Sequence, residues 1–154
     1  MLKKLSKLGK KILLVHGNHE TGSAVKKLCR KYKNLIFIHK TFYVQDNYLF
    51  LGYGGSGFVL VENDFYGTGQ KFRKIIKKNK SKKTIFVTHA PPYKTKLDLI
   101  VTSHCGNKTF RNFALKNRID LYICGHLHEN FGKEDRIRKT RIINPGPYGK
   151  MIGI

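Results

Sequence analysis

Histidine and asparagine residues follow three apolar stretches of this 154-residue chain, each where a predicted strand gives way to a loop. The three segments are Val15-His16-Gly17-Asn18-His19-Glu20, Thr88-His89-Ala90-Pro91-Pro92-Tyr93 and Cys124-Gly125-His126-Leu127-His128-Glu129. In α/β folds, ligands bind at the carboxyl ends of the strands. Imidazole nitrogens are common ligands for transition metals, and an amide oxygen can complete the shell. The sequence therefore predicts a metal site built from strand ends.

Each segment alone has a simpler explanation, because a single histidine at a strand end is commonly a solvated or capping residue. His126 and His128 alternate, so in an extended segment their side chains would point to the same side. Gly125 before them allows a close approach of the backbone. The three segments together, each after an apolar strand, favour the metal site over three unrelated histidines.

Hydrophobic spacing predicts the elements that must position these segments. Apolar runs predict strands at 12–15, 35–38, 42–44, 48–51, 84–88, 121–124 and 141–144, with a last one from Tyr148 to the end. The run at 12–15 is of the kind that is buried on both faces. Helical periodicity predicts helices over 2–8, 22–33, 66–79 and 107–118. Strands that alternate with helices, together with hairpins, indicate an α/β fold with mixed sheets.

Composition places the chain among ordinary globular proteins, with 40% hydrophobic and 26% charged residues. Its length fits one domain over residues 1–154. No apolar run approaches the roughly 18 residues of a membrane span, so no membrane partner is expected. The three cysteines are an odd number without metal-ligand spacing (Cys29, Cys105 and Cys124). We therefore expect a reduced, cytoplasmic protein.

The formal net charge is +22, and residues 71–83 hold eight basic side chains and no acidic one. A positive field of this size attracts nucleic acid, phosphorylated substrates or anionic lipid. The alternative is a lysine-rich solvated surface, because the lysines are spread along the chain and no nucleic-acid-binding fold signature accompanies them. Nucleic acid stays open as a partner.

The combined motifs resemble those of the calcineurin-like metallophosphoesterases, and within them the small bacterial and archaeal phosphodiesterases. The matching segments are Gly17-Asn18-His19-Glu20, the THAPPY segment around His89 and Gly125-His126-Leu127-His128, with further likeness at 94–98 and 144–147. The resemblance extends from near residue 8 to the C-terminus. It implies a layered α-β-β-α sandwich of two mixed sheets flanked by helices.

The resemblance also implies a metal-dependent phosphoester hydrolase with a dinuclear metal site. In such a site two cations clamp the phosphoryl oxygens and activate a water molecule. Asn18, His89 and His126 would bind one ion, and His128 would bind the other. His19 would be catalytic and lie beside the substrate phosphate. The ions could be Mn, Ni, Fe, Zn or Co, and the subgroup favours phosphodiesters.

Further substrate-binding candidates lie near the second motif. His104 is in a loop before a helix, from which it could approach a substrate phosphate, and Tyr93 could line the same pocket. Two other histidines are given no such role. His16 is expected at the rim of the site, and His39, at a strand end away from every motif, is expected to be structural.

Two motifs of the family are absent, namely Asp-x-His after the first strand and Gly-Asp-x-x-Asp after the second. These motifs supply an Asp and a His to the first metal and the Asp that bridges both ions. Glu20 is the first acidic residue of the chain, so neither motif is present. Neutral donors alone would leave two divalent ions uncompensated. Glu20 and Glu129 lie beside the motifs and are expected to be poor substitutes.

We therefore expect a domain without its N-terminal strands, with an incomplete active site that holds one metal ion or none. A missing N-terminal segment or a complementary chain would be its partner. The activity of the 154-residue chain itself stays open. The alternatives are a non-catalytic remnant or half of a split enzyme, and a basic nucleic-acid-binding module. Metal content, metal-dependent turnover and the salt dependence of binding would separate these functions.

Overall fold

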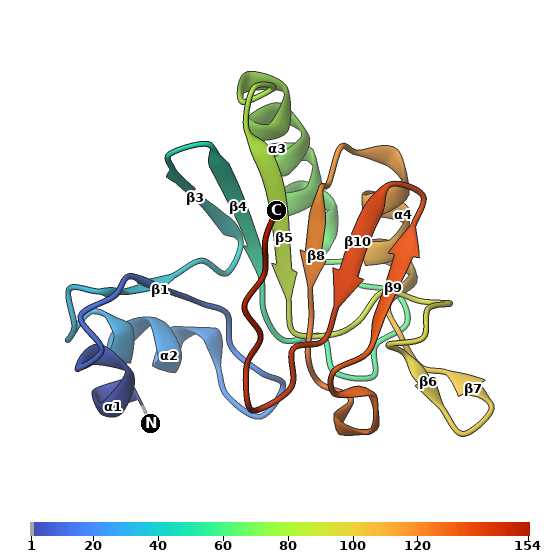
Figure 1. Cartoon of the computed structure of the whole chain (residues 1–154), viewed down its shortest axis with the longest axis horizontal. Coiled ribbons are helices and arrows are strands. Elements are labelled where there is room, and N and C mark those ends of the chain that lie inside the picture. The colour runs from blue at the N-terminus through green and yellow to red at the C-terminus, as the bar shows by residue number, and fades with distance from the viewer. Residues whose placement is uncertain (1) are drawn as a thin grey trace.

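A six-stranded mixed sheet, with strand order β3-β4-β5-β8-β10-β9, forms the centre of the molecule in a computed structural model that describes residues 2–154 (Figure 1). Its strands are β3 (Thr41–Gln45), β4 (Tyr48–Tyr53), β5 (Lys83–Thr88), β8 (Leu121–Ile123), β9 (Glu134–Ile137) and β10 (Thr140–Ile143). The four inner strands run parallel, and the two edge strands are antiparallel to their neighbours. The carboxyl ends of the inner strands therefore meet at one edge of the sheet.

A second, smaller sheet pairs β1 (Ile12–Leu14) with β2 (Leu35–Phe37) in parallel. Helix α1 (Leu2–Ser6) precedes it and α2 (Gly22–Cys29) connects its strands beside the large sheet (Figure 1). Helix α2 begins where the Thr21 side chain accepts a hydrogen bond from the Ala24 amide. Strand β1 is half-buried rather than buried on both faces, because β2 is its only partner strand among residues 2–154.

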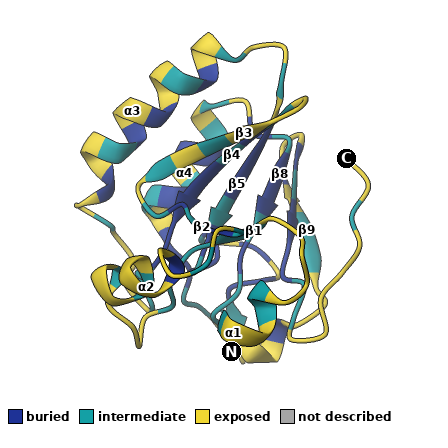
Figure 2. Cartoon of the chain, turned by 90° about the vertical axis from the view of Figure 1, so that its left-hand side faces the viewer, coloured by how far each residue is buried: buried dark blue, intermediate teal, exposed yellow. Residues whose placement is uncertain are grey.

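Aromatic side chains fill the space between the large sheet and the helices α3 (Phe65–Lys78) and α4 (Lys108–Lys116). The rings that contact one another include Phe65, Phe72, Phe86, Phe110, Phe113 and Tyr122. The buried faces of α3 and of the sheet are visible in Figure 2. This layer fixes β5 and β8, whose ends carry two of the predicted metal ligands.

The opposite face of the large sheet is also apolar, with Ile85, Leu121 and Ile143 buried at its centre. The C-terminal segment crosses this face and packs Ile152 against it (Figure 1). Below the large sheet in the view of Figure 1 lie a short hairpin, β6 (Leu99–Ile100) with β7 (Ser103–His104), and the 3-10 turn η1 (His128–Asn130). Within the described residues, no helix has the length and apolarity needed to cross a membrane.

The predicted α/β class is confirmed, and most predicted elements are present with ends shifted by a few residues. The helix predicted over 22–33 ends at Cys29. The strand predicted from Tyr148 onward is wrong, because residues 144–154 form no regular element. The antiparallel partner of β10 is instead β9, with the sequence EDRI. Its polar composition carries no hydrophobic alternation, as is common at a sheet edge.

Candidate functional site

Three loops that carry the predicted ligands converge at the carboxyl edge of the large sheet. His89 follows β5, His126 follows β8 after a two-residue link, and Asn18 lies in the loop after β1. The Gly125 amide donates to the His89 carbonyl oxygen at 3.0 Å, and the His89 amide donates to the Tyr53 carbonyl oxygen at 3.2 Å. These backbone bonds hold two of the loops side by side.

The side chains of Asn18, His89 and His126 lie together. Asn18 Oδ1 is 2.8 Å from His89 Nε2, and the ring centroids of His89 and His126 are 4.9 Å apart. His126 Nε2 is buried and has no hydrogen-bond partner among residues 2–154. A buried polar atom without a partner requires an explanation, and a bound ligand is one. The three donors predicted to bind the same ion are thus brought together by loops from separate strands.

Electrostatics keeps both histidines of this cluster in the neutral form. Burial, reinforced by the neighbouring His126 charge, lowers the pKa of His89 to about 4, while the Glu20 carboxylate acts in the opposite direction. Burial, reinforced by His128, also lowers the pKa of His126. Metal ions bind neutral imidazole, so protons compete less with a metal at these two rings than at a solvated histidine.

Glu20 is placed closer to the cluster than the sequence predicts. A Cβ atom on Gly17 would lie 2.9 Å from Glu20 Oε2 and 3.4 Å from His89 Cε1. Both side chains therefore lie close to the backbone of Gly17, which has no side chain of its own. The carboxylate is exposed and raises the pKa of His89 through its charge. An acidic group therefore lies within electrostatic range of the three neutral donors.

The backbone from His126 to His128 is not extended, although the sequence analysis assumed that it is. His126 has a left-handed backbone, with φ of 68°, and His128 begins the 3-10 turn η1. The His126 ring packs against Phe58 at 4.6 Å, whereas the exposed His128 ring packs against Phe131 at 4.8 Å. The predicted alternation is wrong, because it assumed a strand where the chain turns.

The other predicted site residues occupy two places. His19 is exposed, and its charge lowers the pKa of both His89 and His126, so it lies within electrostatic range of the cluster. Tyr93, at the end of the His89 segment, packs against His104 of β7, with ring centroids 5.7 Å apart. The structure thus forms a donor cluster and, at the same edge, a Tyr93–His104 pair.

A pair formed by His16 and His39 was missed by the sequence analysis. Their ring centroids are 4.4 Å apart, although His39 was expected to lie away from every motif. His39 Nδ1 accepts a hydrogen bond from the Gly54 amide at 2.9 Å, which supports its predicted structural role. His16 packs against Gly22, Gly54 and Gly55 instead of lying freely at the rim. The nearby glycine-rich loop was the available signal for such close packing.

The donors present fit one metal ion better than two. Asn18, His89 and His126 converge, and the unpartnered His126 nitrogen is available as a ligand. Among residues 2–154, however, no three His, Cys, Asp or Glu side chains are grouped so that they could hold a metal ion. A second ion would depend on His128, which is exposed and packs on Phe131. The dinuclear site expected from the motifs therefore does not fit the described donors.

The model of the calcineurin-like phosphoesterase family matches residues 1–130. The chain is 31% identical, over 161 aligned positions, to an uncharacterized protein of Methanocaldococcus jannaschii, and the match covers 99% of this chain and 72% of that protein. TT1561 of Thermus thermophilus has a similar fold, with a TM-score of 0.69 and 15% identity over 94% of this chain. A second crystal structure gives a TM-score of 0.74 and 18% identity over 95% of this chain.

This chain spans 66% of the TT1561 chain and 61% of the second solved chain, so it corresponds to about two thirds of these structures. At such low sequence identity the two structures establish the fold alone. The family model, by contrast, matches most of the chain and includes all three histidine-bearing segments. Phosphoesterases of this family are hydrolases that generally use divalent metal ions. On this evidence the chain belongs to the calcineurin-like phosphoesterase family.

Proposed function

We propose that Asn18, His89 and His126 hold a divalent ion in a phosphoester hydrolase site that needs further donors from another segment or a complementary chain. The observation that carries this proposal is the buried, unpartnered His126 Nε2 beside the Asn18–His89 contact. Family membership supports the reaction class. The subgroup motifs favour phosphodiesters over phosphomonoesters.

In this proposal the Asn18 amide oxygen and the ring nitrogens of His89 and His126 bind the ion. A bound divalent ion supplies Lewis-acid polarisation of a phosphoryl oxygen and lowers the pKa of a water molecule. His19 would act as the catalytic residue. Its ring would stabilise phosphate charge or protonate the leaving oxygen, as positioned imidazoles do in acid catalysis.

The need for further donors follows from charge. Three neutral ligands leave the charge of a divalent ion uncompensated in a partly buried site, which is unfavourable. Glu20 would offset one unit of that charge from its position beside His89. A second ion, with His128 among its ligands, would require a bridging carboxylate from outside the described donors. The unpaired edge of β1 among residues 2–154 offers a place for another strand.

Metal titration of the purified chain tests this proposal. Calorimetry with Mn²⁺, followed by elemental analysis after desalting, is expected to give one ion per chain. Replacing His126 by Ala removes the buried, unpartnered nitrogen and should weaken binding measurably. The expected loss is at least about tenfold, which corresponds to about 1.4 kcal/mol. The matched control is His128→Ala, which removes an exposed histidine of the same loop and should leave this affinity unchanged.

Hydrolysis of an aryl phosphodiester is measured on the same samples. The chain alone should show little Mn²⁺-dependent turnover. Among residues 2–154, the Asn18–His89–His126 cluster includes no donors for a second ion. Two bound ions with Mn²⁺-dependent turnover would show that this donor count is wrong. No metal binding, or equal binding by wild type and His126→Ala, would contradict the proposed site and favour a non-catalytic remnant.

Nucleic-acid binding is the second candidate, and the exposed face of α3 favours it. Lys71, Lys74 and Lys78 line a shallow groove beside Phe42, and residues 65–83 contain no acidic side chain. Phosphate contacts by such cations release counterions, so binding would weaken steeply as salt is raised. A salt titration of oligonucleotide binding without metal separates this function from the hydrolase. Binding that is absent at low salt would exclude it.

A further inference from the structure

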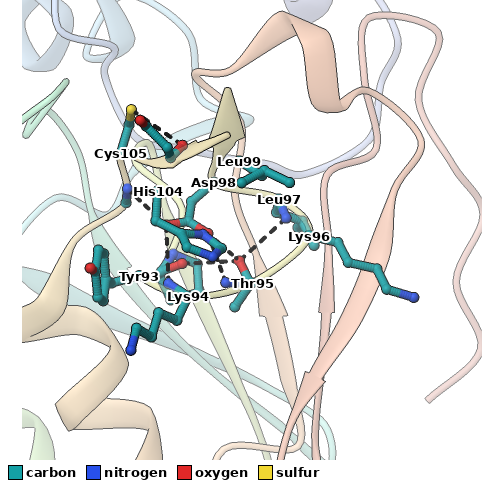
Figure 3. Close-up of polar contacts among 12 residues, drawn as sticks. Tyr93, Lys94, Thr95, Lys96, Leu97, Asp98, Leu99, His104 and Cys105 are labelled. Carbon is teal, nitrogen blue, oxygen red and sulfur yellow. Dashed lines mark hydrogen bonds and ion pairs between the residues drawn. The ribbon is translucent and has the colours of Figure 1, made fainter. Parts of the chain in front are cut away.

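A buried carboxylate contacts His104, which ends strand β7 in the chain segment between the His89 and His126 loops. Asp98 is fully buried, and Figure 3 shows the polar groups that converge on it. Its oxygens accept hydrogen bonds from the amides of Lys94, Thr95 and Gly106 at 2.7–3.0 Å, from Thr95 Oγ1 at 3.3 Å and from His104 Nδ1 at 2.9 Å. This number of donors satisfies the charge that burial would otherwise penalise.

The Asp98 contact decides which nitrogen of His104 carries the proton. An ionised carboxylate can only accept hydrogen bonds, so Nδ1 must donate, and Nε2 is left as the free nitrogen. The His104 side chain is 33% exposed, whereas Asp98 is 0% exposed. Since Nδ1 faces the buried carboxylate, Nε2 lies on the opposite, accessible side of the ring. Among the described residues no hydrogen bond is made by Nε2.

The loop that carries this pair is tied to both histidine segments of the donor cluster. The Asn107 amide donates to the Pro91 carbonyl oxygen at 2.8 Å, next to the His89 segment. Asn130, which ends the turn after His126, donates through Nδ2 to the carbonyl oxygens of Leu97 and Leu99 at 2.9 and 3.1 Å. His104 therefore has a fixed place relative to His89 and His126.

The surroundings of His104 suit an anion. The Tyr93 ring lies edge-on to His104 at 5.7 Å, and Lys108 Nζ lies 4.9 Å from the centre of that ring. Lys94 is exposed beside them. Asp98 is the carboxylate that faces His104, and its oxygens already accept hydrogen bonds from three backbone amides. A tyrosine ring that contacts Lys108 thus packs against an imidazole whose Nδ1 is hydrogen-bonded to a carboxylate.

We propose that His104 is a substrate-contacting residue whose Nε2 binds a phosphate oxygen of the phosphoester, with Asp98 as the positioning residue. The proposal rests on the hydrolase function above and assigns a further residue to that site. In the complex the ring would donate from Nδ1 to the Asp98 carboxylate and from Nε2 to the phosphate oxygen. A charge-assisted bond of this kind is stronger than one between neutral groups.

Nitrogen NMR of the histidine rings tests the proposal. Long-range ¹H–¹⁵N spectra of the Zn²⁺-loaded and metal-free chain are recorded with inorganic phosphate and then with dimethyl phosphate as probes, and the spectrum of His104→Ala assigns the ring. Without probe, Nδ1 should have the shift of a protonated nitrogen, because it donates a hydrogen bond to Asp98. Addition of a probe that binds should move the Nε2 shift saturably. A response to dimethyl phosphate identifies a diester contact, and a response to phosphate alone identifies a monoester contact.

Variants separate this role from a structural one. His104→Ala should weaken binding of the responding probe by about tenfold, and His104→Gln, which keeps an N–H donor, should restore part of it. Asp98→Asn should disturb the Nδ1 shift of His104. The control Thr102→Ala, at an exposed position between β6 and β7, should change none of these readouts.

The outcomes distinguish the two proposals. Zn²⁺-induced shifts at His89 and His126, together with a His104 ring that ignores both probes, would overturn the His104 assignment and leave the metal site standing. If Zn²⁺ fails to shift His89 and His126, the metal site is wrong, and the metal-free titration then decides the anion contact by itself. Equal probe affinity for wild type and His104→Ala would also overturn the assignment, even if Asp98→Asn fails to fold.

Discussion

Acid should destabilise the fold through His39, the ring that packs against His16 behind the site loops. His39 Nδ1 accepts the Gly54 amide hydrogen bond at 2.9 Å, which requires this nitrogen to be unprotonated. Burial lowers the pKa of His39 from 6.5 to about 4, and the charges of His16 and Lys40 act in the same direction. The folded state therefore holds the ring neutral at pH values where an unfolded chain protonates it.

The sign and size of the effect follow from this difference. Between pH 6.5 and about pH 4 the unfolded chain binds a proton that the folded chain excludes, so the free energy of unfolding falls as pH falls through this window. Above pH 6.5 the contribution is constant, and below about pH 4 the loss is complete. The lowering of the His39 pKa from 6.5 to about 4 corresponds to about 3 kcal/mol at most. Because the ring is half-buried and water screens it, we expect about 1–2 kcal/mol.

Urea unfolding of the metal-free protein at several pH values from 7.5 to 4 measures this loss. His39→Asn offers an amide oxygen to the Gly54 amide but cannot titrate. Its unfolding free energy should therefore fall less than that of wild type over this range, by about 1 to about 2 kcal/mol. His128→Asn, at an exposed position, serves as the control and should keep the wild-type slope. An acid slope in His39→Asn equal to that of wild type would refute the reasoning.

Three further substitutions test the packing that supports the site, each by urea unfolding at neutral pH. Gly52→Ala should destabilise by about 3 kcal/mol, since its Cβ would collide with the Ile38 carbonyl oxygen between β4 and the segment after β2; a loss below about 1 kcal/mol would contradict this contact. Gly67 lies on the exposed face of α3, where an added Cβ would have no neighbour within 4 Å. Gly67→Ala should therefore stabilise the fold by about 0.5–1 kcal/mol, and a loss of stability would show that this position is not open. Phe86→Ala should cost about 3–5 kcal/mol because Phe86 is fully buried between the sheet and the helices, and a cost near that of a surface substitution would place it outside the core.

Local hydrophobic patterns were sufficient to predict the inner strands and α3. The runs at 84–88 and 121–124 are apolar enough to form buried strands in many tertiary contexts, and they appear as β5 and β8. Strand β9 could not be found in this way, because its pairing with β10 comes from backbone hydrogen bonds rather than from apolar side chains. The irregular C-terminal segment was mistaken for a strand because its apolar residues pack on the sheet face without joining a sheet.

The sequence by itself determined which donor types are present and that each follows a strand, because covalent order fixes a residue next to its neighbours. It also determined the shortage of carboxylates, since no acidic residue precedes Glu20. Only the tertiary structure decided which donors meet. The Asn18–His89–His126 cluster, the approach of Glu20 to Gly17 and the Asp98–His104 pair depend on how separate loops pack at one sheet edge. The direction of His126 depends on a left-handed backbone at a single residue, which residue spacing does not encode.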